Sequence, residues 1–187
     1  MSASNLRELL IEELKDIYDA EQRITKALPK MAKAADSEEL KTAFQEHLRQ
    51  TEQQIKRLEQ VFDELDETAK RKECKAMVGL LEEGEELMDE EDNPSDVLDA
   101  GLITAAQKVE HYEMAAYGSL RTWADLLGES KVVNLLQTTL DEEGETDKKL
   151  TEIAQSLNIE AMQDEDMERG EGEEVPVRAT KRNHRSS

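Results

Sequence analysis

Apolar residues recur at steps of three and four along most of the chain, the spacing that places them on one face of an α-helix. No segment shows the alternation typical of a half-buried β-strand. The pattern predicts helices over residues 4–33, 36–65, 70–91, 94–128 and 130–157. We therefore expect an all-α protein with four long helices and one shorter helix, residues 70–91, placed between the second and third long ones.

The way these helices connect indicates their arrangement. Residues 66–93 are long enough to return the chain along a bundle, so the second and third long helices are expected to run parallel. Two antiparallel helix pairs joined by a long crossover connection make a ferritin-like four-helix bundle. We expect this bundle over residues 1–160. Residues 161–187 carry an acidic run, a basic end and few apolar side chains, which is typical of a flexible charged tail.

Composition narrows the classes of function. The chain has 45 acidic and 24 basic side chains, a formal charge of −21, which disfavours binding to nucleic acid phosphates. The same charge would attract cations, or it would suit a salty, halophilic cytoplasm, and composition does not separate these. Cys74 has no cysteine partner, no apolar run is long enough for a membrane span, and the first residues do not resemble a signal peptide. A cytoplasmic location is expected.

On each long helix the apolar residues form a stripe that should face the bundle interior. Several polar side chains occupy positions within these stripes. A carboxylate there costs several kcal/mol unless something pairs with it, and a bound cation is the simplest partner. These polar positions occur on all four long helices: Glu21; His47, Thr51 and Gln54; Glu110 and Glu113; Glu143 and Asp147. Taken singly, a Glu at the edge of a stripe can reach water, and a lone His is more often a core residue than a ligand. Their coincidence on four facing helices indicates a metal site.

We therefore predict that six side chains converge on one site: Glu21, His47, Glu110, Glu113, Glu143 and Asp147. Gln54 is a less favoured ligand. Carboxylates with one histidine suit iron or manganese better than zinc, and one or two divalent ions would fit. His111 points about 100° away from Glu110 and is expected on a flank. Tyr18, Tyr112 and Tyr117 are candidate hydrogen-bond donors to the carboxylates, although Tyr117 suits plain core packing equally well.

Several of these positions lie in short sequence motifs. Residues 107–113 read Gln-Lys-Val-Glu-His-Tyr-Glu, residues 19–22 read Asp-Ala-Glu-Gln, and residues 139–143 read Thr-Leu-Asp-Glu-Glu. Together with His47, Thr51 and residues 72–77, they resemble the YciE/YciF group of ferritin-like stress proteins over residues 4–158. The resemblance implies a ferritin-like bundle with an extra helix, often dimeric, associated with stress responses.

The sequence differs from the wider di-iron pattern, in which two helices each carry Glu-x-x-His. The second helix has no core-facing Glu, and Thr146 stands where the last helix would carry a histidine. We expect either a metal-binding protein that handles iron or a small oxidant such as peroxide, with weak di-metal oxidase activity, or a structural stress protein acting through homodimer or partner contacts. A helical adaptor that acts through its tail is a third, less favoured hypothesis.

Overall fold

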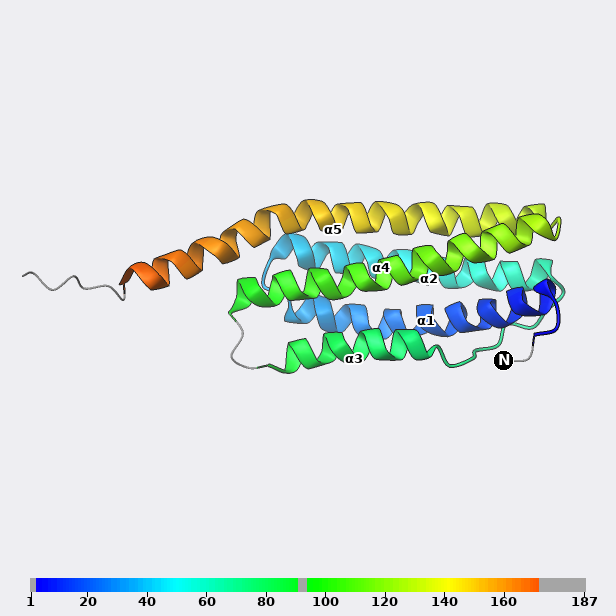
Figure 1. The fold of residues 1–187 in the computed structure, drawn as a ribbon, viewed down its shortest axis with the longest axis horizontal. Coiled ribbons are helices and arrows are strands. Elements are labelled where there is room, and N and C mark those ends of the chain that lie inside the picture. The colour runs from blue at the N-terminus through cyan, green and yellow to red at the C-terminus, as the bar shows by residue number, and fades with distance from the viewer. Residues whose placement is uncertain (1–2, 91–93, 172–187) are drawn as a thin grey trace, which may run out of the picture.

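The computed structural model describes residues 3–90 and 94–171. It has five helices: α1 (Leu6–Ala34), α2 (Glu38–Glu64), α3 (Lys75–Asp89), α4 (Ser95–Leu126) and α5 (Ser130–Glu171). The described residues contain no strand, so the prediction of an all-α fold is confirmed. α1 and α2 form one antiparallel hairpin, α4 and α5 form a second, and the two hairpins pack into a four-helix bundle (Figure 1).

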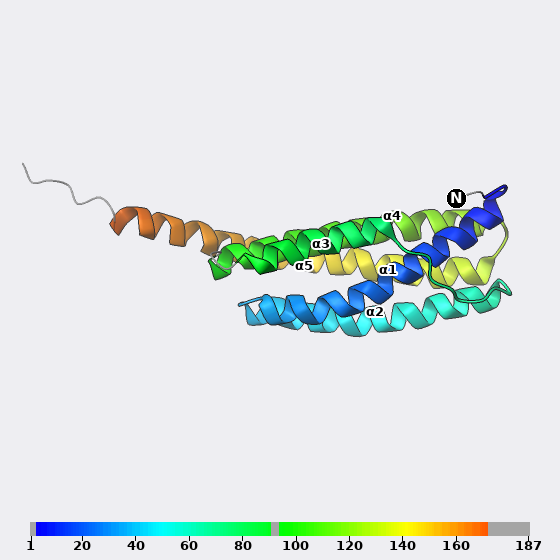
Figure 2. The same cartoon turned by 90° about the horizontal axis from the view of Figure 1, so that it is seen from below.

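The crossover between the hairpins has the predicted topology. α2 and α4 run in the same direction, and the chain returns between them through α3, which packs on the outside of α1 and α4 (Figures 1 and 2). The predicted start of the third helix at Lys70 is wrong, because residues 67–74 are irregular and α3 begins at Lys75. Asp19 of α1 holds this segment by accepting hydrogen bonds from the side chain of Arg71 and the backbone N–H of Cys74.

The ends of the helices are fixed by local hydrogen bonds. The side chain of Asn5, just before α1, accepts a hydrogen bond from the backbone N–H of Glu8. The side chain of Ser37 accepts one in the same way from Leu40 at the start of α2. Gly128 has a φ of 78° in the turn between α4 and α5, a conformation that suits glycine directly after the end of a helix. These signals keep both hairpin turns short, so the paired helices stay in register along the bundle.

The last helix is longer than its apolar stripe predicts. α5 continues to Glu171 and extends past the end of the bundle, where the stripe indicated an end at Leu157 (Figure 1). Ile159 and Met162 in this extension are 53% and 60% exposed. The helix therefore continues beyond the end of the apolar stripe, and the segment predicted as a charged tail is helical as far as Glu171. Its remainder, residues 172–187, lies outside the described residues.

The core is built mainly from aliphatic side chains, with Phe44, Phe62 and Tyr117 as its largest members. Leu10, Leu14 and Ile17 of α1 are almost completely buried, which matches the predicted inward face of that helix. Among the described helices, none combines the length and the apolar character needed to cross a membrane. The aliphatic layers enclose a polar region halfway along the bundle.

Candidate metal centre

Polar side chains enter the middle of the bundle from all four long helices. α1 contributes Glu21, α2 contributes His47, α4 contributes Glu110 and Glu113, and α5 contributes Glu143. Each stands on the inward stripe of its helix, at a position where an apolar side chain would be expected. The same periodicity that buries the leucines therefore buries these five side chains.

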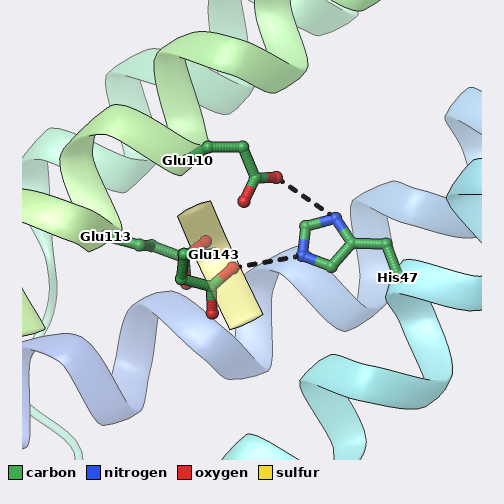
Figure 3. Close-up of side chains that lie close together, drawn as sticks. All are labelled: His47, Glu110, Glu113 and Glu143. Carbon is green, nitrogen blue, oxygen red and sulfur yellow. Dashed lines mark ion pairs between the residues drawn. The ribbon is translucent and has the colours of Figure 1, made fainter. Parts of the chain in front are cut away.

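Four of the five form a compact group, which we name the carboxylate–histidine cluster: His47, Glu110, Glu113 and Glu143 (Figure 3). One ligand atom from each lies within 4.8 Å of the others. None of the four side chains is more than 5% exposed. The cluster thus brings three carboxylates and an imidazole together out of contact with bulk water.

The imidazole of His47 lies between two of the carboxylates. Its Nδ1 is 3.2 Å from Oε1 of Glu110, and its Nε2 is 3.7 Å from Oε2 of Glu143 (Figure 3). Neither contact has hydrogen-bond geometry, and in the described structure both oxygens of Glu110, Glu113 and Glu143 find no hydrogen-bond donor. Buried polar atoms are rarely left in this condition, so the cluster has unused capacity to coordinate a ligand.

Burial changes the acid–base properties of these groups. It raises the pKa of Glu110 well above its ordinary value, and the nearby charge of Glu143 adds to the effect. Burial likewise raises the pKa of Glu113, and of Glu21, well above the usual range, and here too the neighbouring carboxylates contribute. Crowded like charges in a low-dielectric interior thus favour uptake of protons, or of a cation in their place.

Glu21 is not one of the four residues of the carboxylate–histidine cluster. Oε1 of Glu21 accepts a hydrogen bond from the hydroxyl of Tyr117, and both side chains are completely buried. Oε2 of Glu21 has no donor among the described residues. Of the two explanations left open for Tyr117, the structure shows the hydrogen bond to a carboxylate. Tyr18 and Tyr112 instead donate to Glu59 and Asp16, so they do not orient the cluster.

Asp147 does not join the other predicted ligands. Its side chain is 22% exposed, and its Oδ1 lies 3.2 Å from Nε2 of His111 and accepts a hydrogen bond from Gln107. The expected convergence of six side chains is therefore wrong for Asp147, because its position four residues after Glu143 lies at the edge of the stripe, facing α4. His111 is on a flank and 67% exposed, as predicted.

Gln54 is completely buried beside the cluster, and sequence reasoning missed the network that holds it. Its Nε2 donates to Oε2 of Glu142. The guanidinium of Arg57 donates to both carboxylate oxygens of Glu142 and also to the hydroxyl of Thr139. Oε1 of Gln54 has no donor in the described structure. In the sequence, Gln54 and Arg57 are spaced by three residues on α2, as are Thr139 and Glu142 on α5. Helix periodicity shows that each pair shares a face, but it does not show that the two pairs face each other.

The donor set fits a divalent cation. Three carboxylates and one imidazole, all buried and short of hydrogen-bond donors, offer oxygen and nitrogen ligands that suit iron or manganese. Among the described residues this is the one group of three or more acidic, histidine or cysteine side chains with ligand-compatible spacing. The arrangement can therefore coordinate a metal ion in a closed, water-poor site.

Comparison with known proteins places this architecture in a family. Residues 5–163 match the family described as a domain of unknown function, DUF892. The chain is also 46% identical over 155 residues to Protein YciF of Escherichia coli (strain K12), covering 82% of this chain and 93% of that protein. The chain belongs to the DUF892 family. The resemblance inferred from residues 107–113 and the other motifs is confirmed.

Two solved structures of similar proteins share the fold. The crystal structure of the E. coli stress protein YciF matches with a TM-score of 0.80 at 44% identity, over 83% of this chain and 98% of that one. A protein from Rhodopseudomonas palustris, YcfI, described provisionally as structural, matches with a TM-score of 0.77 at 43% identity, over 79% of this chain and 94% of that one. The five-helix arrangement is thus common to these relatives.

Proposed function

We propose that this protein binds a divalent metal ion, iron or manganese, in the carboxylate–histidine cluster and acts as a metal-handling stress protein. The observation that carries the proposal is the set of buried carboxylate oxygens on Glu110, Glu113 and Glu143 that no donor satisfies. Their mutual repulsion opposes folding, and a cation would relieve it. The E. coli relative is named a stress protein, which supports a role of the same kind here.

The proposal assigns a task to each side chain. His47, Glu110, Glu113 and Glu143 would hold the ion, and Glu21, held by Tyr117, would supply a further oxygen or the start of a second ion position. Bound iron or manganese would supply redox chemistry toward oxygen or peroxide. The closed aliphatic surroundings exclude water, and the raised pKa values of Glu21 and Glu113 allow these carboxyls to take up protons when the metal leaves.

The second candidate is a structural stress protein that acts through contacts with another copy or with a partner. The provisional description of the Rhodopseudomonas palustris relative favours it. In that case the cluster would serve stability, and metal content would be low or irrelevant to activity. The two candidates differ in whether the purified protein carries a metal.

Metal analysis tests the proposal. The protein is purified without chelator, incubated anaerobically with Fe²⁺ or Mn²⁺, desalted and analysed by inductively coupled plasma mass spectrometry. We expect about one to two ions per chain, and a large loss for His47→Gln and Glu110→Gln but not for Glu86→Gln, an exposed position on α3. Consumption of oxygen or hydrogen peroxide by the iron-loaded protein then separates an enzyme from a metal carrier. A wild-type chain that retains no ion under these conditions would favour the structural candidate.

A further inference from the structure

The carboxylate–histidine cluster is closed on every side, so an ion needs a route to it. None of its four side chains is more than 5% exposed. A hydrated cation loses its water most easily where partly exposed ligand atoms replace that water in steps. The question is therefore which seam between helices carries acidic or histidine side chains that are both near the cluster and open to solvent.

Two of the four seams are unfavourable for a cation. The α1–α4 seam is covered by α3 (Figure 2). The α2–α5 seam is bridged by ion pairs that place positive charges over it, Arg57 with Glu142 and Lys149 with Glu46. Both acids there are already paired with a cation, so neither offers a free carboxylate to an approaching metal ion.

The α1–α2 seam offers no such ligand within one turn of the site. Near Glu21, the nearest acid on α1 is Asp19, which is 3% exposed and is occupied by Arg23 and Arg71. Near His47, the one acid within a turn is Glu46, which belongs to the α2–α5 seam through its contact with Lys149. This leaves the seam between α4 and α5.

The α4–α5 seam carries a graded series of ligand atoms. His111, next to Glu110 in sequence, is 67% exposed and places Nε2 3.2 Å from Oδ1 of Asp147. Asp147 is 22% exposed and stands one helical turn from Glu143. Glu110 of the cluster is completely buried, and neither of its oxygens has a donor in the described structure.

Two further observations connect these groups. Gln107, one turn before Glu110, donates from Nε2 to Oδ1 of Asp147 at 3.1 Å and to Thr151 at 2.9 Å, so it fixes the Asp147 side chain at the seam. The charge of Asp147 also contributes to raising the pKa of Glu110, after burial and the other carboxylates, so the two groups share one electrostatic environment. Gln107 and His111 also line an open groove of about 950 Å³ between α3 and α4, so this flank of α4 is open to solvent.

We propose that His111 and Asp147 form an outer coordination point through which a divalent cation passes to and from the buried cluster. The inference rests on the proposed function, because it deepens the account of the same site. The exposed imidazole and the half-buried carboxylate bind the partly hydrated ion, and Glu110 and Glu143 take it up one turn further in. The pair supplies two ligands, so the ion is held weakly and moves on.

Kinetics of Co²⁺ uptake test this route. Stopped-flow absorption follows loading of the apo protein with Co²⁺ alone, and release into excess chelator follows the reverse step. Asp147→Asn should slow both loading and release about tenfold, the scale on which local charge changes association rates, and leave the dissociation constant within about threefold. His111→Gln, at a side chain exposed enough to leave folding intact, should slow both steps in the same way. Glu145→Gln, which removes one charge two residues from Glu143 on an exposed part of α5, should load at the wild-type rate.

Each other outcome has a distinct meaning. Loading of Asp147→Asn and His111→Gln at the wild-type rate would overturn the route and leave the metal site intact. Loss of equilibrium binding in Asp147→Asn as severe as in Glu143→Gln would overturn it as well, because Asp147 would then be a ligand of the final site. A wild-type chain that takes up no Co²⁺ would contradict the proposed function itself, and the route with it.

Discussion

The hydroxyl of Tyr117 donates a hydrogen bond to Oε1 of Glu21, and both side chains are completely buried at the edge of the carboxylate–histidine cluster. The bond ties α4 to α1 at the depth of the site. It also gives Glu21 the one donor it has among the described residues, since Oε2 has none. Tyr117 therefore combines core packing with orientation of a carboxylate that faces Glu113.

Replacing Tyr117 by Phe should destabilise the apo protein by about 1–3 kcal/mol, because it leaves a buried acceptor without its donor. Tyr18→Phe is the matched control, since the hydroxyl of Tyr18 donates to Glu59 at the exposed surface, and it should cost less than about 0.5 kcal/mol. Urea denaturation of the two variants measures both values. Equal effects would mean that the buried hydrogen bond contributes no more than a surface one.

Replacing Glu113 or Glu143 by Gln should have opposite effects on the apo and the metal-bound protein. Removing one of several buried like charges should stabilise the apo form by about 1 kcal/mol or more. The same change should weaken metal binding at least about tenfold, because a ligand oxygen with negative charge is lost. Thermal melting with and without Mn²⁺ reports both effects. Glu86→Gln, on the exposed face of α3, should change neither, and a similar response from it would point to general surface charge instead.

The apo protein should become less stable as pH rises from about 5 to 8. Burial raises the pKa of Glu21, Glu110 and Glu113 above its unfolded value, so the folded chain holds protons that the unfolded chain releases. The unfolding free energy therefore falls as pH rises through this window. Tyr117, His47 and Glu143 face the same groups.

With saturating Mn²⁺, the trend should weaken or reverse, because metal competes with protons for the same oxygens. Urea midpoints at several pH values, with and without the ion, measure the effect. Apo Glu113→Gln should show a smaller pH dependence than the wild type, since one of the titrating groups is gone. An apo midpoint that rises steadily across this window would contradict the assignment of raised pKa values.

Removing residues after Asn158 should leave the melting temperature of the protein within about 2 °C of the full-length value, because Ile159 and Met162 are exposed and bury little surface. The helical circular dichroism signal should fall, since α5 continues to Glu171. Ile153→Ala, at a side chain 2% exposed on the same helix, should instead cost about 2–5 kcal/mol. A large loss of stability on truncation would show that the extension packs on the bundle.

The stripes predicted the bundle and most of the site because helix periodicity fixes which side chains share a face. Glu21, His47, Glu110, Glu113 and Glu143 interrupt long apolar stripes, so burying the neighbours buries them too. Periodicity is less decisive at a stripe edge. A step of four residues turns the helix by 40° more than one full turn, which is enough to move Asp147 from the cluster toward α4 and His111.

Other features depend on contacts that no local pattern encodes. Asp19 and Asp99 are buried because they accept hydrogen bonds from distant backbone groups, Asp19 from Cys74, and Asp99 from Asp36 and Ser37. The end of α5 was missed for a different reason. An apolar stripe marks where a helix packs, not where it ends, so the polar extension of α5 leaves no signal in the stripe.

The central claim is that an ion binds among His47, Glu110, Glu113 and Glu143. The most direct test is a crystal structure of the protein grown with Mn²⁺, with anomalous diffraction data that locate manganese without reference to the protein chain. The account predicts an anomalous peak inside the bundle, about 2.0 to 2.3 Å from a ring nitrogen of His47 and from carboxylate oxygens of Glu110 and Glu143. Peaks confined to the acidic surface, with the interior of the cluster free of manganese at saturating concentration, would contradict it.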